Sequence, residues 1–140
     1  MTKSKGPSTT GYSGKPLPQK LGLAAGQRVA FLHAPDHWDD LIGPMPSDVV
    51  RAAKLTPDLN LAVLFVTERK VLAKEFAPIT KQMAQGGMIW VCWPKKSAKM
   101  ESDLDENIVR DIGLKENWVD VKVCAVSEIW SGLKFLRRRK

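Results

Sequence analysis

The chain has 140 residues and a formal net charge of +7; 44% of the residues are hydrophobic and 26% are charged. These values indicate a globular domain with its own hydrophobic core, and they exclude collagens, disulfide-rich mini-domains and wholly disordered chains. The longest uncharged run, 82–94, has thirteen residues and is too short to cross a bilayer, and residues 1–20 hold no apolar stretch that would serve as a secretory signal. We therefore expect a soluble cytoplasmic protein.

The positive charge lies at the two ends of the chain. Residues 1–20 contribute +4 and residues 134–140 contribute +5, whereas residues 21–133 hold 13 basic and 15 acidic side chains. A dedicated nucleic-acid-binding domain would gather its bases on one face of the fold. Two interpretations stay open: the basic ends keep the chain in solution, or they contact polyanions weakly and without sequence preference. The polyanion contacts would come from Lys3, Lys5, Lys15, Lys20, Arg137, Arg138, Arg139 and Lys140.

Composition divides the chain into three parts. Residues 1–20 are rich in Gly, Pro, Ser, Thr and Lys, so we expect a flexible basic segment that cannot bury enough surface to offset its ordering entropy. Residues 21–137 carry the apolar periodicity of a single α/β domain, and residues 138–140 form a short basic end.

The first predicted elements are short. Residues 28–32 read as a strand entered through a glycine-containing turn, and 37–42 as a helix with Asp36 as N-cap, ended by Gly43-Pro44. The run 49–53 fits either a short strand or a helical turn.

Four later runs predict strands. Residues 59–66 are apolar on both faces, which is typical of a central parallel strand, and 88–92 form a second buried strand. Residues 118–126 alternate, and 129–136 would be their antiparallel partner. The expected apolar face of the alternating run consists of Val119, Val121, Val123 and Ala125. The element order predicts a three-layer, Rossmann-like α/β fold, with a mostly parallel sheet and a C-terminal antiparallel hairpin.

Two helices separate these strands. The first would start after Thr67 as N-cap and end at Gly86-Gly87, with a kink or restart at Pro78. Its apolar positions are Leu72, Phe76, Ile79 and Met83. The second would span 103–112, with Ser102 and Asp105 as a capping pair and Gly113 as its end.

Two stretches resemble the class I methyltransferases that use S-adenosylmethionine. Residues 21–32, LGLAAGQRVAFL, resemble the entry into that family's first strand, and 58–95 resemble its fourth strand, following helix, Gly-Gly turn and fifth strand. The hairpin at 118–136 is similar to the family's last two strands. The resemblance implies a methyltransferase-like scaffold over most of 21–137.

The chain departs from that family where the family holds its cofactor. The family's first strand ends in glycines that let the backbone approach the cofactor, whereas residues 33–37 here read HAPDH, without glycine. The family ends its second strand with an acid for the ribose hydroxyls, and no acid ends 49–53. Only 26 residues separate 28–32 from Leu59, so the topology looks truncated by one strand–helix unit. We expect no working cofactor site and no cofactor.

The whole-chain pattern more closely resembles an uncharacterised family of small bacterial proteins, a domain of unknown function. The residues that carry this resemblance are Lys20-Leu21-Gly22, Gly86-Gly87, Ile89-Trp90-Val91, Pro94-Lys95 and Trp130-Ser131-Gly132-Leu133. The resemblance implies a bacterial cytoplasmic protein, and it supplies no information about an activity.

Three loops are expected to meet beyond the carboxyl ends of the parallel strands, where open α/β sheets bind ligands. These loops are 33–40, 67–70 and 93–96. Their bases would suit a small anion that bears a phosphate or carboxylate. The other interpretation is a solvated charged loop, with Trp93 covering the edge of the core. The candidate ligand-binding residues are His33, Asp36, His37, Thr67, Arg69, Trp93, Lys95 and Lys96.

No set of residues predicts a catalytic or metal centre. His33 and His37 have a four-residue spacing, but Pro35 between them removes the helix on which two ligands would share a face. No nucleophile motif surrounds the serines, and Cys92 and Cys124 lie in strand-like runs, as reduced structural thiols do.

Two classes of function remain. The first is a non-enzymatic binding or interaction domain on a methyltransferase-like scaffold, and the second is an enzyme or binder that acts on a small anion.

Trp38, Trp93 and Trp130 lie near loops or strand ends, where an exposed indole would anchor a partner.

Overall fold

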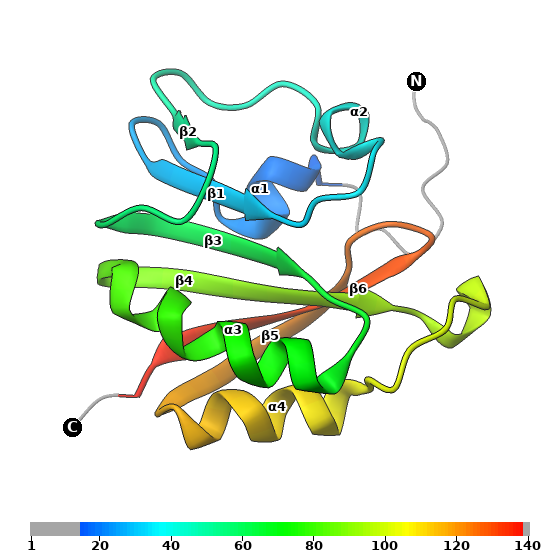
Figure 1. Ribbon diagram of the computed structural model, residues 1–140. Helices are drawn as coiled ribbons and strands as arrows, with labels where there is room; N and C mark the ends of the chain where they lie inside the picture. The colour runs from blue at the N-terminus through cyan, green and yellow to red at the C-terminus, as the bar shows by residue number, and fades with distance from the viewer. Residues whose placement is uncertain (1–14, 139–140) are drawn as a thin grey trace.

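The computed structural model describes residues 15–138. They form a six-stranded sheet in the order β2-β1-β3-β4-β6-β5 (Figure 1). The strands are β1 (Arg28–Leu32), β2 (Val50–Ala52), β3 (Leu59–Phe65), β4 (Met83–Pro94), β5 (Trp118–Ala125) and β6 (Trp130–Arg137). The helices are α1 (Leu17–Leu21), α2 (Trp38–Ile42), α3 (Arg69–Gln82) and α4 (Glu106–Lys115), with a 3-10 turn at Lys96–Ala98. The α/β fold with a mixed sheet and a closing hairpin is confirmed.

Strand pairing sets which loops lie together. β1 pairs in parallel with both β2 and β3, and β3 pairs in parallel with β4. The predicted mostly parallel sheet is therefore confirmed, while the pairing of β1 with β2 was not predicted. β6 runs antiparallel to β4 and to β5. The carboxyl ends of β1, β3 and β4 therefore open on the same edge of the sheet.

Each face of the sheet has its own apolar core. On one face, Ala62 and Leu64 of β3 pack with Leu72 and Phe76 of α3. On the other, Leu61, Val63 and Phe65 of β3 pack with Leu21 of α1 and Trp38 of α2. The two helix layers explain why β3 is apolar on both sides, since neither face reaches water.

The N-terminal elements correct two expectations. Residues 17–20 were expected to be flexible, yet Leu17–Leu21 forms α1, in which Leu21 is fully buried and packs on the sheet. Residues 1–14 lie outside the described part of the chain. α2 begins after His37 rather than Asp36, and no side chain caps it. The ambiguous run at 49–53 is a short parallel edge strand, β2.

The boundaries of α3 also differ from the prediction. The helix begins after Glu68 rather than Thr67 and runs without interruption through Pro78. It ends at Gln82, not at Gly86-Gly87, because β4 already starts at Met83 and both glycines lie within that strand. A Cβ on Gly87 would lie 2.9 Å from the Leu59 carbonyl oxygen. Gly87 thus allows close strand pairing where β3 and β4 shift register, and Gly86 adopts φ 78° beside it; neither glycine ends the helix.

In α4, the capping residue is Asp105, whose carboxylate accepts a hydrogen bond from the Ile108 amide at 2.9 Å. Ser102 does not cap it; its hydroxyl donates to the Thr67 carbonyl oxygen at 2.8 Å. Gly113 lies inside α4, two residues before its end. A Cβ at this position would meet the Phe135 ring at 2.2 Å. The glycine lets α4 approach β6 closely and does not end the helix.

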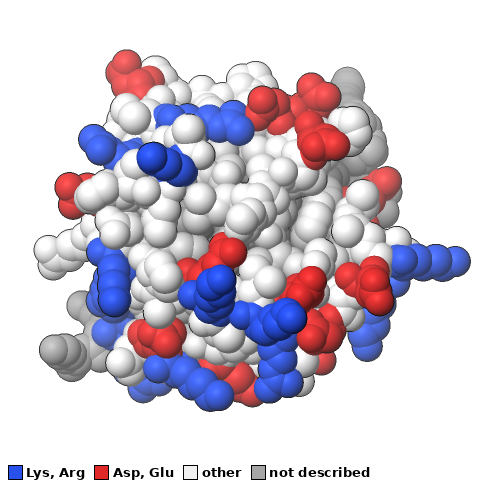
Figure 2. Space-filling model, viewed as in Figure 1, with Lys and Arg blue, Asp and Glu red and all other residues white. Residues whose placement is uncertain are grey.

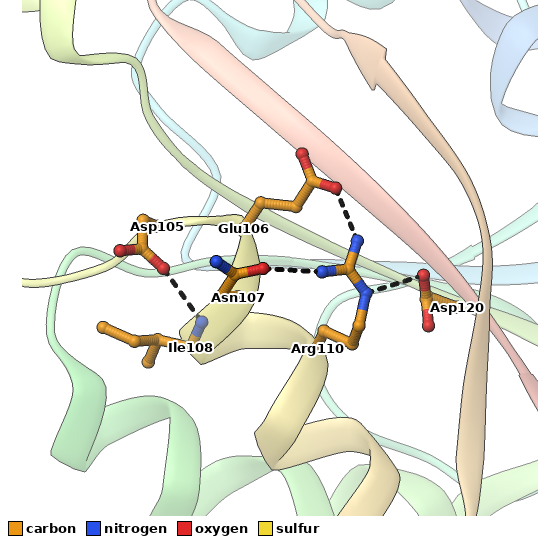
Figure 3. Close-up of polar contacts among 6 residues, drawn as sticks. All are labelled: Asp105, Glu106, Asn107, Ile108, Arg110 and Asp120. Atoms are coloured by element: carbon orange, nitrogen blue, oxygen red, sulfur yellow. Dashed lines mark hydrogen bonds and ion pairs between the residues drawn. The ribbon is translucent and has the colours of Figure 1, made fainter.

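The C-terminal hairpin differs from the prediction in one respect. Val121 and Val123 are each half exposed, because β5 is an edge strand and its register with β6 shifts between Asp120 and Lys122. An ion-pair network ties α4 to this edge, in which the Arg110 guanidinium donates to Asp120 and Glu106 (Figure 3).

Candidate functional site

An aromatic cluster fills one side of the carboxyl edge of β1 and β3. The Trp38 ring from α2 packs edge-on against Phe31 and Phe65, with centroids 5.3 and 4.9 Å away. Phe65 also contacts Trp130, with centroids 5.2 Å apart. Trp38, Trp93 and Trp130 are 1%, 6% and 8% exposed, so the prediction of exposed tryptophan anchors is wrong. These indoles contribute to the cores instead.

The loop after β1 follows a strained path. His33 has φ 57°, a left-handed conformation that costs about 1–2 kcal/mol for a residue with a Cβ. Its Nε2 lies 2.8 Å from Glu75 Oε1 on α3, which holds the imidazole over that helix. Asp36 and His37 continue the loop and are exposed.

His33 and Glu75 line a cavity of about 440 Å³ on the α3 side of the sheet, together with Leu32, Leu55 and Ile79. Its walls are mostly apolar. No helix lies between β2 and β3 to cover this part of the sheet.

The loop after β3 opens on a larger groove. It has a volume of about 1340 Å³ and lies between the start of α3, residues 101–103 and α4. Thr67 and Arg69 line it, but the Asp103 carboxylate already accepts from the Arg69 amide at 2.7 Å. Figure 2 shows Lys and Arg interleaved with Asp and Glu over the lower half of this face, where α3 and α4 lie. The groove therefore has mixed charge rather than a concentrated positive potential.

The three residues predicted in loop 93–96 are placed differently, because Trp93 belongs to β4 and only Lys95 and Lys96 follow that strand. Trp93 is buried in the α3-side core. Lys95 is half-buried, and its amide donates to the Ile129 carbonyl oxygen at 2.7 Å. Lys96 is exposed at the start of the 3-10 turn.

The eight predicted ligand residues thus share an edge of the sheet, but they do not line one cavity. Thr67 and Arg69 face the groove, whereas His33 lines the smaller cavity. The sequence reading missed Glu75 and Asp103, which contact residues 42 and 34 positions away. The capping pattern around Ser102 was the one sequence signal that pointed to residues 101–105 as an ordered segment next to the candidate site.

The residues predicted to contact polyanions are also separated. Lys15 is exposed, but Lys20 is only 6% exposed, and its Nζ donates to the Ala125 carbonyl oxygen at 3.0 Å. The Arg137 guanidinium stacks over Trp118, 4.7 Å from the ring centroid. Arg138 is exposed. Lys3, Lys5, Arg139 and Lys140 lie outside the described residues.

Both cysteines are free thiols. Complete burial raises the pKa of Cys92 well above its ordinary value. Burial also raises the pKa of Cys124, although nearby lysines oppose the shift. Within residues 15–138, no three His, Cys, Asp or Glu side chains are grouped to hold a metal ion, and no helix is long and apolar enough to span a membrane.

The fold is shared with solved methyltransferase structures. Precorrin-6y C5,15-methyltransferase from Geobacter metallireducens superposes with a TM-score of 0.59 at 8% identity, over 86% of this chain and 85% of that one. A SAM-dependent methyltransferase from Aquifex aeolicus gives 0.53 at 14% identity, over 84% and 85%. Fibrillarin from Aeropyrum pernix, solved with natively bound S-adenosyl-L-methionine, gives 0.54 at 11% identity, over 90% and 70%.

No protein-family model matches the chain, and no curated protein matches it. The similarity to solved structures therefore shows a methyltransferase-like α/β fold. At these identities it carries the fold and not the activity.

Proposed function

We propose that this chain is a non-enzymatic binding domain on a methyltransferase-like scaffold, without a working S-adenosylmethionine site. The observation that carries the proposal is the Trp38 cluster. In an open α/β sheet, the ligand crevice lies beyond the carboxyl ends of the strands, where the connections change direction. Here that position falls between β1 and β3, and the indole of Trp38 packs against the last aromatic residue of each.

The loop after β1 supports the same conclusion. A cofactor that approaches the backbone closely needs glycine in this loop. The chain instead places His33, Ala34 and Pro35 there, and Glu75 holds the imidazole of His33. Neither β2 nor the residue after it supplies a carboxylate for ribose hydroxyls, since the strand ends in Ala52 and Ala53 follows.

A thermal-shift titration tests the proposal. A ligand at 100 times its dissociation constant stabilises the folded state by ~2.7 kcal/mol, which raises Tm by several degrees in a chain of this size. We expect S-adenosylmethionine and S-adenosylhomocysteine, each at about 1 mM, to leave Tm unchanged. A saturable rise in Tm with either compound would contradict the proposal.

A second candidate function is an enzyme or binder that takes a small anion at the carboxyl edge of the sheet. The parallel pairing of β1, β3 and β4 favours it, because that pairing brings the three predicted loops to one edge. Replacing Lys95 and Lys96 with Ala would weaken binding of such an anion with little loss of stability, since solvated loop charges contribute little to folding. Unchanged binding by that variant would remove this candidate.

The proposal extends to family, location and domain organisation. Lys20-Leu21-Gly22 and the Trp130–Leu133 segment support membership of the bacterial family of unknown function, and with it a cytoplasmic location. Residues 21–137 would form one domain, with α1 as an added N-terminal turn. Fractionation of the native host tests the location: recovery in the membrane or periplasmic fraction would contradict it.

A further inference from the structure

Lysines from four separate segments gather on the α1 side of the sheet. Lys20 comes from α1, Lys95 follows β4, Lys122 lies on β5 and Lys134 lies on β6. We refer to Lys95, Lys122 and Lys134, with Lys20 behind them, as the lysine face. The sequence gives no hint of it, because the four positions span more than a hundred residues.

Strand register fixes the centre of the lysine face. Lys122 and Lys134 lie directly opposite each other in the β5–β6 ladder. Lys134 in turn pairs with Trp90, whose indole donates to the Leu21 carbonyl oxygen at 2.8 Å and so faces α1. A Cβ on Gly22 would lie 3.9 Å from Lys134 Nζ, which places that ammonium group beside the end of α1.

Lys20 and Lys95 lie at the hairpin end of this face, close enough to Lys122 for the charges of Lys95 and Lys122 to act on Lys20. Lys20 Nζ donates to the Ala125 carbonyl oxygen at 3.0 Å, just beyond Cys124 on β5. Lys95 is held against the hairpin through its amide, which donates to Ile129. Burial lowers the pKa of Lys20, and the charges of Lys122 and Lys95 lower it further, although Cys124 opposes them.

Three of these cations, Lys95, Lys122 and Lys134, have no ion-pair partner among the residues that the structure describes. Within residues 15–138 the ion pairs are made by His33, Arg51 and Arg110. Residues 1–14 and 139–140 contain no Asp or Glu. Like charges directly opposite in an antiparallel ladder destabilise it, so an external anion would relieve a repulsion that the fold leaves in place.

We propose that the lysine face binds a compact, multiply charged phosphate anion, of the pyrophosphate or triphosphate class. Lysine binds phosphate as a point charge, and ammonium groups from different elements can converge on one ligand. A compact anion fits better than a polymer backbone, because residues 21–133 hold more acids than bases and offer no extended basic track. This inference is independent of the cofactor proposal, since Lys122 lies on β5, Lys134 lies on β6 and Lys95 follows β4, and none of them belongs to the loop after β1.

Calorimetric titration of the full chain with sodium triphosphate at low salt tests the proposal. We expect saturable binding to the wild type. The affinity should fall about tenfold or more in Lys95→Ala/Lys122→Ala/Lys134→Ala, because three ammonium groups that hold the triphosphate are lost. The matched control Lys74→Ala/Lys81→Ala/Lys115→Ala removes the same charge from α3 and α4 and should bind within about twofold of wild type. The triple Lys→Arg variant keeps the charge and should retain most of the affinity, which separates loss of charge from loss of fold.

Cys124 provides a second readout on the same face. Burial raises the pKa of its thiol, and Lys20, Lys122 and Lys95 oppose that rise, so an anion that neutralises these lysines should raise the pKa further and slow alkylation by iodoacetamide. We expect triphosphate to slow the reaction in wild type, at the concentrations where calorimetry shows binding, and to leave the triple Ala variant unaffected.

Three results would overturn the proposal. The first is equal triphosphate affinity in wild type and the triple Ala variant. The second is loss of binding in Lys3→Ala/Lys5→Ala/Arg139→Ala/Lys140→Ala, which would assign the anion to the chain ends. The third is a short oligothymidylate that binds through the lysine face when triphosphate does not, which would assign the face to nucleic acid.

Discussion

The indole of Trp38 packs edge-on against the ring of Phe65, with centroids 4.9 Å apart, at the point where β1 and β3 end. This contact joins α2 to a central strand of the sheet, within the core that also includes Leu21 of α1. The indole Nε1 has no hydrogen-bond partner among residues 15–138, so the side chain serves by its bulk rather than by its polar group. The contact is therefore structural.

Replacing Trp38 with Ala should lower the free energy of unfolding by ~3–5 kcal/mol, because it leaves a cavity between Phe31 and Phe65. Trp38→Phe should cost less than ~1.5 kcal/mol, since it keeps an aromatic ring and removes an unpartnered donor. Leu41→Ala, an exposed position on the same helix, is the control. Urea denaturation measures all three, and similar losses for Trp38→Ala and Leu41→Ala would refute the packing role.

Gly113→Ala should be destabilising although alanine is the better helix former. The new methyl group would meet the Phe135 ring at 2.2 Å, and the crowding should cost ~1–3 kcal/mol or more. Gly113→Ala should cost less stability in a Phe135→Leu background than in wild type, because the smaller side chain leaves room for the methyl group. If Gly113→Ala raises the unfolding midpoint instead, α4 does not lie this close to β6.

Local signals predicted the strands well and the helix ends poorly. The apolar runs at 28–32, 59–66 and 88–92 lie in β1, β3 and β4, because buried parallel strands need little beyond continuous apolar side chains. Glycine is a local signal for a helix end, but at Gly87 and Gly113 tertiary contacts decide the conformation. In both places another group occupies the position of a side chain, and sequence periodicity carries no information about that.

For the candidate site, the sequence predicted only that its loops lie at one edge of the sheet. Parallel pairing follows from element order, so it correctly brought the loops after β1, β3 and β4 together. It could not show that His33 turns toward Glu75 or that Asp103 reaches the Arg69 amide. Those contacts depend on how α3 and the 101–105 loop pack, which short-range patterns do not encode.

Stability should fall with alkaline pH through Cys92. Burial raises its pKa in the folded state above the ordinary value of 9.0, so the folded state holds the thiol proton where the unfolded state releases it. The resulting stabilisation is complete below pH 9 and is lost as pH rises above it. We expect the difference in unfolding free energy between wild type and Cys92→Ala to shrink from pH 8 to about pH 10.

The comparison with Cys92→Ala isolates this residue, because Lys20 and Cys124 titrate in both proteins. The lowered pKa of Lys20 acts in the opposite direction, adding stability as pH approaches 10.5. A difference that stays constant from pH 8 to about pH 10 would mean that Cys92 ionises equally in both states.

The central claim is that the methyltransferase-like scaffold holds no working cofactor site. Isothermal titration calorimetry of the full chain with S-adenosylhomocysteine tests it most directly, because the product analogue binds without turnover. We expect no saturable heat at ligand concentrations up to about 1 mM, because the loop after β1 holds no glycine and Trp38 packs beside it against Phe31. Stoichiometric binding with a micromolar dissociation constant would contradict it.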